Sequence, residues 1–169
     1  MITNVVACAD LSCNIDLRAL ANTCANCIYD PKKFSSVMWK SRTVGGLCMV
    51  FSNGKIMVNG KVTCVKDCKR RLRRYARLIQ RLGWQVRLKK IKVCTISAHF
   101  KMDDTPNLPN IARRYDGRYD PDRFPALHFS HDGISYTVFH TGTILMTGIK
   151  KECQLQSRCI PTILNMTLV

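Results

Sequence analysis

The chain has 169 residues, 46% of them apolar, which is enough to fill one compact domain or two small ones and excludes a mainly disordered chain. Its 27 Lys and Arg against 11 Asp and Glu give a formal net charge of +16, which attracts polyanions, chiefly nucleic acid, unless the basic surface is merely solvated. No apolar run approaches the ~20 residues that cross a bilayer and the first residues lack a signal-peptide pattern, so we expect a soluble intracellular protein.

The first half of the chain predicts strands between two helices. Residues 4–10 (NVVACAD) predict a short apolar strand, and Asp16 is a candidate N-cap for a helix over residues 17–27. Pro31 ends any helix. Three strands are then predicted, the last two joined by a hairpin turn at Asn53-Gly54; they span residues 34–40 (FSSVMWK), 46–51 (GLCMVF) and 55–60 (KIMVNG).

A long basic helix is predicted over residues 67–83, ended by Gly83. One face of this helix is apolar and consists of Leu72, Tyr75, Ala76, Ile79 and Leu82. The rest of its surface is basic and consists of Arg70, Arg71, Arg73, Arg74, Arg77 and Arg81. The helix is therefore expected to pack by one stripe and to present arginines to solvent.

The second half of the chain repeats the first. YDPKKF at residues 29–34 returns as YDPDRF at 119–124, and FSNGKIMVNG at 51–60 returns as FHTGTILMTG at 139–148. We predict two copies of one unit, residues 1–86 and 87–169. In the second copy a strand is predicted over residues 92–100, a short helix over 111–117, and a helix over 151–164 that Pro161 ends or kinks.

The ten cysteines do not predict a disulfide framework, because nothing in the sequence indicates a secreted protein. Cys24 and Cys27 have the spacing of a zinc knuckle, and Cys64 and Cys68 could supply two further ligands. No His or Asp lies nearby in ligand spacing, and buried free cysteines are common. We therefore expect reduced thiols and no metal.

Strand alternation predicts which side chains share a face of the sheet. One face is expected to carry Leu47, Met49, Phe51, Lys55, Met57 and Asn59, and the other Cys48, Val50, Ile56 and Val58. Two helices per unit can cover only one face, so an apolar face on a basic protein remains for a nucleic acid. Its aromatic residues could stack on single-stranded bases, or they could enter a DNA minor groove as wedges; the duplication of the Phe-containing strings favours wedges.

These strings resemble the core of the TATA-box-binding protein family. The resemblance rests on NVVACADLSCNIDLRAL, YDPKKF, FSNGKIMVNG and RRYARLIQRLGW in the first copy, and on YDPDRFPAL and FHTGTILMTG in the second. Order, spacing and duplication agree over nearly the whole chain. The resemblance implies an α+β fold, a pseudo-twofold saddle in which a curved ten-stranded antiparallel sheet lies on the minor groove and carries helices on its convex face.

The resemblance also implies DNA-binding residues. The intercalating pairs are Phe34 with Phe51 and Phe124 with Phe139, the second pair supported by Pro125. The other implied contacts with the groove or the phosphates come from both repeats: Asn4, Val6, Lys40, Met49, Lys55, Met57, Asn59, Thr95, Ser97, Leu145 and Thr147.

The sequence departs from the family pattern mainly in the second repeat. Thr95 and Ser97 stand where Asn and Val are expected, and Thr143 stands where a Lys is expected. The loop SHDGIS lacks the basic residues of the family, and Gly45 replaces an Arg in the first repeat. On the groove face the departures are Met57, Asn59 and Thr137. Because lost phosphate contacts weaken binding and its salt dependence, we expect the first repeat to hold DNA more strongly.

Protein partners are implied as well. The basic helix matches the family surface for a transcription factor IIA-like protein, through Lys69, Arg70, Arg73, Arg74 and Arg77. Asp120 and Asp122 match acidic residues that contact a transcription factor IIB-like protein, whereas Lys32 and Lys33 replace such acids in the first repeat. The RNA polymerase machinery is the remaining implied partner, in the nucleus or at a site of viral transcription, and no cofactor is implied.

We therefore expect a general transcription initiation factor that bends AT-rich, TATA-like promoter DNA by Phe intercalation and recruits assembly factors. An enzyme is not expected, because His128 and His131 have no nucleophile partner and the adjacent Asp103 and Asp104 face apart. The alternative is a saddle-fold regulator that acts mainly through proteins, with weak or non-TATA DNA binding. The missing basic residues favour this alternative and the four retained Phe oppose it.

Overall fold

The computed structural model describes residues 1–168; Val169, the last residue of the second predicted repeat, lies outside them. The chain forms two compact units. The N-terminal unit is Asn4–Cys94, and the C-terminal unit combines Met1–Thr3 with the residues from Thr95 onward. This division follows spatial compactness, so the repeat boundary at residues 86 and 87 stays a prediction.

The N-terminal unit is an antiparallel sheet with strand order β2-β3-β4-β5-β1. Its elements are β1 (Ile2–Asp10), α1 (Leu17–Thr23), β2 (Cys27–Ile28), β3 (Ser36–Trp39), β4 (Leu47–Phe51), β5 (Lys55–Asn59) and α2 (Val65–Arg81). Asp16 caps α1 as predicted, because its side chain accepts hydrogen bonds from the N–H groups of Arg18 and Ala19. The helix ends earlier than predicted, since Cys24 is already extended.

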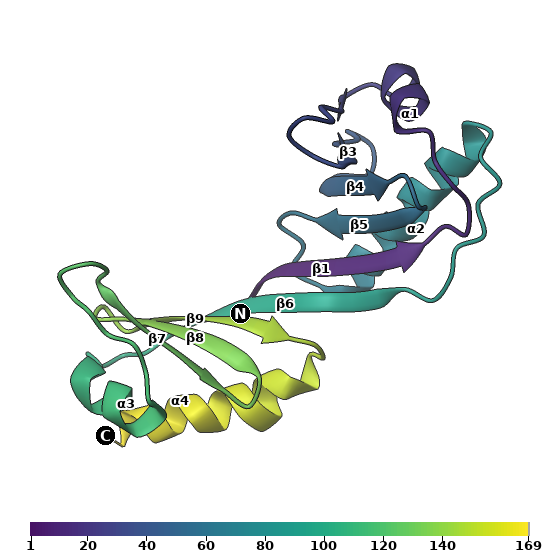
Figure 1. Cartoon of the computed structure of the whole chain (residues 1–169). Coiled ribbons are helices and arrows are strands. Elements are labelled where there is room, and N and C mark those ends of the chain that lie inside the picture. The colour runs from purple at the N-terminus through teal and green to yellow at the C-terminus, as the bar shows by residue number, and fades with distance from the viewer. Residues whose placement is uncertain (169) are drawn as a thin grey trace. The chain divides into compact units, whose positions relative to one another are not determined.

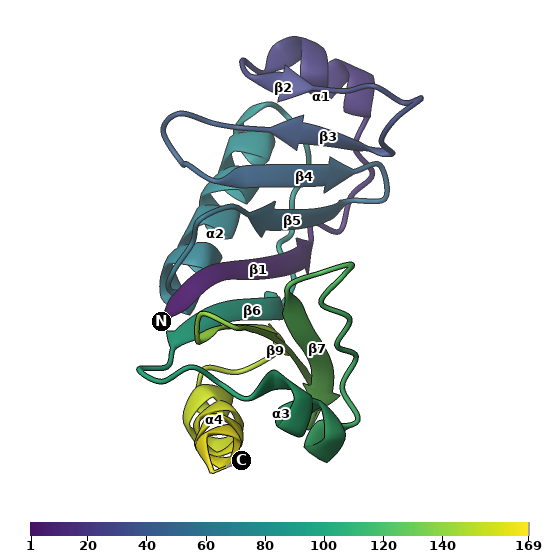
Figure 2. The same ribbon diagram turned by 90° about the vertical axis from the view of Figure 1, so that its left-hand side faces the viewer.

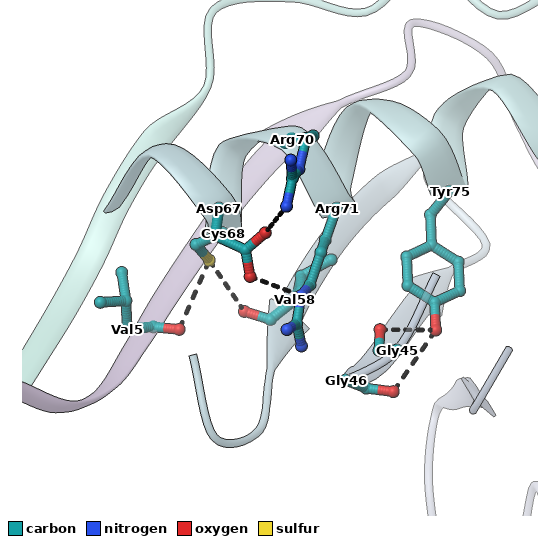
Figure 3. Close-up of polar contacts among 9 residues, drawn as sticks. All are labelled: Val5, Gly45, Gly46, Val58, Asp67, Cys68, Arg70, Arg71 and Tyr75. Atoms are coloured by element: carbon teal, nitrogen blue, oxygen red, sulfur yellow. Dashed lines mark hydrogen bonds and ion pairs between the residues drawn. The ribbon is translucent and has the colours of Figure 1, made fainter. Parts of the chain in front are cut away.

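The long basic helix α2 covers one face of this sheet (Figure 1), and Figure 2 shows it passing behind β3, β4, β5 and β1. Its predicted stripe is buried at Leu72, Tyr75, Ala76 and Ile79, whereas Leu82 is the C-cap and is 37% exposed. Cys68 joins the stripe, and its Sγ donates to the carbonyl oxygens of Val5 and Val58 at 3.4 and 3.9 Å (Figure 3).

The Tyr75 hydroxyl connects α2 to the loop between β3 and β4. It accepts from the Ser41 N–H at 3.0 Å. It also lies 3.2 Å from the Gly45 carbonyl oxygen and 3.4 Å from that of Gly46 (Figure 3). Its ring meets Trp39 edge to face, with centroids 5.3 Å apart. Burial raises the pKa of Tyr75, an effect that the hydrogen bond from Ser41 partly offsets, so the phenol is neutral at physiological pH.

We expect Tyr75→Phe to lower the free energy of unfolding by about 1–3 kcal/mol, because the partly buried Ser41 N–H loses its acceptor. Urea denaturation followed by circular dichroism measures this change. Tyr119→Phe, at a half-exposed residue before β7, is the matched control and should change the same quantity by less than about 0.5 kcal/mol. Equal effects of the two substitutions would show that the Tyr75 hydroxyl does not stabilise the loop.

The C-terminal unit is an antiparallel sheet with strand order β6-β9-β8-β7. Its elements are β6 (Lys92–Lys101), α3 (Leu108–Tyr115), β7 (Ala126–His131), β8 (Ile134–Phe139), β9 (Thr143–Ile149), a π-helical turn (Leu155–Cys159) and α4 (Ile160–Thr167). In Figure 1, α4 lies along one face of β7, β8 and β9, and it buries Thr162, Ile163 and Met166. The π-helical turn directly precedes the first turn of α4, which contains Pro161. Proline cannot donate a backbone hydrogen bond, so the regular α-helical pattern is interrupted here, as predicted for Pro161.

Nine strands are present among residues 1–168, so the prediction of ten strands is corrected. The missing strand is the second-repeat counterpart of β2, and only a single bridge between Arg118 and His128 remains of it. Gly117 stands 90 residues after Cys27, where β2 begins. Glycine is a poor strand former, and here a Cβ atom would lie 2.6 Å from the end of the Leu127 side chain, so a larger residue would require Leu127 to shift. The α+β class is unaffected.

Among residues 1–168, no helix has both the length and the apolar character needed to cross a membrane.

Candidate nucleic-acid interface

The sheet of the N-terminal unit has one buried face and one partly exposed face. Cys48, Val50, Ile56 and Val58 lie beneath the helices and are at most 1% exposed. The other face carries the predicted residues of β1, β4 and β5 in the expected alternation, each partly exposed: Asn4, Val6, Met49, Phe51, Lys55, Met57 and Asn59. The alternation of the strands therefore assigned these side chains to the correct face of the sheet.

The C-terminal unit alternates in the same way. Ile96, Ala98, Val138, Ile144 and Met146 are buried, at most 3% exposed. Predicted DNA-binding residues lie on the opposite face of β6, β8 and β9: Thr95, Ser97, Phe139, Leu145 and Thr147. Within residues 1–168, each unit thus leaves one face of its sheet without helices, and these two faces are the candidate interface.

The duplicated Tyr-Asp-Pro strings form two equivalent turns that expose a Phe. The Phe34 N–H donates to the carbonyl of Asp30, and the Phe124 N–H to that of Asp120, both at 2.9 Å. Phe34 is 47% and Phe124 45% exposed. Each Phe lies two residues before its strand, so it is at the end of the sheet and not within a strand.

The predicted Phe pairs are not equally close. The rings of Phe124 and Phe139 are 6.1 Å apart and tilted by 58°. Phe51 pairs across the strands with Ser36, two residues beyond Phe34, but no ring contact between Phe34 and Phe51 is found in the part of the chain described. Pro125 is exposed beside Phe124.

The two predicted central groove residues are held by internal hydrogen bonds. Asn4 Nδ2 donates to Asn59 Oδ1 at 2.8 Å, while Thr95 Oγ1 accepts from the Gly148 N–H at 3.1 Å. Asn4 Oδ1 is buried and has no hydrogen-bond partner among residues 1–168. Asn4 and Asn59 therefore act as a pair, whereas Thr95 is tied to the backbone of its neighbouring strand.

Cross-strand pairing reveals two matched rows of side chains on the exposed faces, which the sequence interpretation did not assemble. In the N-terminal unit the sulfur row is Met38, Met49, Met57 and Cys8. In the C-terminal unit the histidine row occupies the corresponding places with His128, Thr137, Leu145 and His99. Met38 and His128 follow the duplicated string by the same number of residues, and this spacing was the signal that would have identified them.

Four lysines gather beside the exposed face of the N-terminal unit. A hollow of about 770 Å³, here called the lysine hollow, is lined by Phe51 and Met57 together with Lys55, Lys89, Lys90 and Lys92. The segment that carries the last three is fixed to β1, because the N–H groups of Arg87 and Lys89 donate to the carbonyls of Leu11 and Asp10. Lys89 also forms a long ion pair with Asp10, at 3.8 Å. Only Lys55 of these lysines was predicted from the sequence.

At two lysine positions of the N-terminal face, the C-terminal face has hydroxyl side chains. Lys40, exposed after β3, corresponds to Ser130, and Lys55 corresponds to Thr143. Ser130 shares a hydrogen bond with Ser135 at 3.2 Å, so this face carries hydroxyl groups where the N-terminal unit carries charge.

The predicted partner-binding arginines of α2 lie together on the helix side of the N-terminal unit. Arg70, Arg73, Arg74 and Arg77 line a groove with Val86 and Leu88, and Lys69 lines a neighbouring one. Arg70 is ion-paired with Asp67 at 2.5 Å (Figure 3). Arg73, Arg74 and Arg77 take part in none of the ion pairs found in residues 1–168.

Asp120 and Asp122 are both exposed, in the turn before β7. The Asp120 carboxylate lies 3.8 Å from Arg123, and its backbone carbonyl holds the turn that presents Phe124. Asp120 therefore stabilises this turn in addition to any contact with a partner.

The zinc-knuckle hypothesis finds no geometric support. Cys68 is buried on the inner face of α2, where its Sγ contacts the Val5 and Val58 carbonyls, whereas Cys24 is the C-cap of α1 and Cys27 begins β2. Burial raises the pKa of Cys27 to about 12, with the neighbouring Cys24 adding to the effect, so the thiol is protonated at neutral pH. Within residues 1–168, no group of three or more His, Cys, Asp or Glu is placed to hold a metal ion.

Comparisons with known proteins agree with the geometry. The family model described as "Transcription factor TFIID (or TATA-binding protein, TBP)" matches residues 1–82 and 90–165. The chain is 29% identical over 157 residues to TATA box-binding protein-like 2 of Mus musculus, an alignment that covers 90% of this chain and 45% of the relative. It is 31% identical over 153 residues to the TATA-box-binding protein of Candida albicans, covering 88% of this chain and 64% of the relative. The chain thus spans about half to two thirds of the length of these relatives.

A solved structure shows the same fold. Methanococcus jannaschii TBP matches with a TM-score of 0.86, covering 99% of this chain and 98% of that chain at 23% sequence identity. The likeness confirms the predicted fold.

Proposed function

The chain belongs to the transcription factor TFIID, or TATA-binding protein, family, and on that premise we propose that it binds and bends double-stranded promoter DNA through the exposed faces of its two sheets. The relatives are named for binding a TATA box, and the same ligand class suits this chain. The minor groove is the proposed site, because an extended apolar sheet face gains contact area when it opens and bends that groove.

The observation that carries the proposal is the pair of equivalent turns that expose Phe34 and Phe124. Large apolar side chains are normally buried, so two Phe exposed by almost the same fraction at corresponding places require an explanation. Insertion between base steps buries them, and the unstacking costs a few kcal/mol per step, which the added contact offsets. Their neighbours Phe51 and Phe139 lie on the same faces and extend the wedges.

We further propose that the helix side recruits assembly factors in the nucleus, with no catalytic role. The groove with Arg73, Arg74 and Arg77 suits an acidic partner such as a transcription factor IIA-like protein. The exposed Asp120 and Asp122 suit a basic surface of a transcription factor IIB-like protein. RNA polymerase machinery would follow these factors.

One observation favours a second function, a regulator that acts mainly through proteins. The C-terminal face has Ser130 and Thr143 where the N-terminal unit has lysines, and fewer phosphate contacts mean weaker DNA binding. The exposed Phe at both ends still favour DNA binding.

Affinity and bending measured on a TATA duplex and on a scrambled duplex, each at two salt concentrations, separate the two functions. We expect tighter binding and a bend on the TATA duplex, with affinity that falls as salt rises. Fluorescence energy transfer between the duplex ends reports the bend, and anisotropy reports the affinity. If neither duplex is bound at low salt, the regulator replaces the DNA-binding factor as the function.

A further inference from the structure

The sulfur row and the histidine row occupy corresponding places but differ in their hydrogen-bonding chemistry. Met38, Met49 and Met57 offer thioethers, which are weak acceptors and cannot donate, and Cys8 adds only a weak thiol. The histidine row offers two imidazoles and a hydroxyl, all of which donate and accept. Both rows lie on the faces proposed to meet DNA, and the present inference rests on that proposed function.

His128 is positioned by two neighbours. Its Nδ1 lies 3.0 Å from Thr137 Oγ1, and its ring stacks on Phe124 with centroids 5.1 Å apart and planes 23° from parallel. No hydrogen bond to its Nε2 is found among residues 1–168. The side chain is exposed, so it is available to a ligand that covers this face.

The pair of His128 and Thr137 adapts to either polarity. When Nδ1–H donates to the Thr137 hydroxyl, Nε2 is an acceptor; when the hydroxyl donates to Nδ1, Nε2–H is a donor. A single pair of side chains can therefore accept a hydrogen bond from a base or donate one to it.

This difference matters because of what the minor groove presents. An A·T pair shows only acceptors there, whereas a G·C pair adds the guanine 2-amino group as a donor. Against the sulfur row that amino group would lose its water without gaining a good acceptor, which is unfavourable. Against the histidine row, the guanine 2-amino group meets a good acceptor.

We propose that the histidine row accepts G·C base pairs in the minor groove and that the sulfur row requires A·T, so that the binding site has an A·T half and a half that tolerates G·C. His128 and Thr137 are the specificity-determining residues of the second half. The site is then directional, even though the chain is built from two copies of one unit.

Three duplexes of equal length, each made of two different complementary strands so that the two halves can differ, test the proposal by fluorescence anisotropy. One is all A·T, one carries G·C in a single half, and one carries G·C in both halves. The wild-type chain should bind the single-half duplex within about threefold of the all-A·T duplex, because it can orient its histidine row over the G·C half. It should bind the both-half duplex about tenfold or more weakly, since one unsatisfied donor costs about that factor.

Two variants and one base analogue sharpen the test. His128→Met/Thr137→Met should weaken binding to the single-half duplex, relative to the all-A·T duplex, by about tenfold. Met38→His/Met49→Thr should instead restore the affinity for the duplex that carries G·C in both halves. Inosine in place of guanine removes only the 2-amino group, so an I·C both-half duplex should bind wild type about as well as A·T.

The inference is overturned if the single-half duplex loses as much affinity in wild type as in His128→Met/Thr137→Met, or if inosine restores nothing. Those results can occur while the all-A·T duplex is still bound and bent, and they then leave the proposed function intact. Absence of binding to every duplex would instead overturn the proposed function, and this inference with it.

Discussion

Phe34→Ala and Phe124→Ala should each abolish one of the two kinks in bound DNA and weaken binding about thirtyfold or more. The expected size is that of an interface hot spot, a large side chain that becomes buried on binding. Both Phe are almost half exposed in the free chain, so their removal should hardly change stability. Energy transfer between labelled duplex ends measures the bend, and the double variant should leave the duplex nearly straight.

Phe100→Ala is the matched control for these substitutions. Phe100 is 41% exposed, close to Phe34 and Phe124, but it pairs with buried Ile144 and so lies on the side of β6 opposite the candidate interface. Its removal should leave bend angle and affinity unchanged. A bend that survives Phe34→Ala/Phe124→Ala would refute intercalation, and a bend lost equally in Phe100→Ala would point to general loss of structure.

The exposed faces could be predicted because strand alternation is a local property. Met49, Phe51 and Met57 alternate with buried residues inside single strands, so a window of ten residues suffices to place them. Because the sequence is duplicated, the corresponding residues of the second repeat could be placed in the same way. Recognition of the family added Asn4, but the structure shows that its amide is bound to Asn59, a contact between strands 55 residues apart that no local pattern contains.

Other features were missed because long-range contacts create them. The family resemblance implied a tenth strand, yet only the isolated bridge between Arg118 and His128 is present at the place that corresponds to β2. The segment with Lys89 and Lys90 has no periodicity, and only its backbone hydrogen bonds to β1 bring these lysines beside Phe51. From the sequence alone, lysines in an irregular segment cannot be distinguished from solvated surface charges, because the strand to which the segment is hydrogen-bonded is not known.

Substitution of two lysines in the lysine hollow is the second change from which we expect a large effect on DNA binding. Lys89→Ala/Lys90→Ala should weaken DNA binding about tenfold to a hundredfold at low salt and reduce the slope of log affinity against log salt by about 1.8. The physical reason is counterion release, about 0.9 per phosphate contact on duplex DNA. Neither lysine packs in the core, so stability should be nearly unchanged. Titrations at several salt concentrations measure the slope directly.

Arg74→Ala/Arg77→Ala is the control that decides whether position or total charge matters. It removes the same charge from the same unit, but from the helix that covers the opposite face of the sheet. If the lysines touch phosphate, the slope should change for Lys89→Ala/Lys90→Ala and hardly for the arginine pair. Equal slopes in the two variants would show that the lysines of the lysine hollow act only through the net charge of the protein. Unequal slopes would mean that the N-terminal unit, with lysines at 40, 55, 89 and 90, compensates for the hydroxyl groups at Ser130 and Thr143 in the other unit.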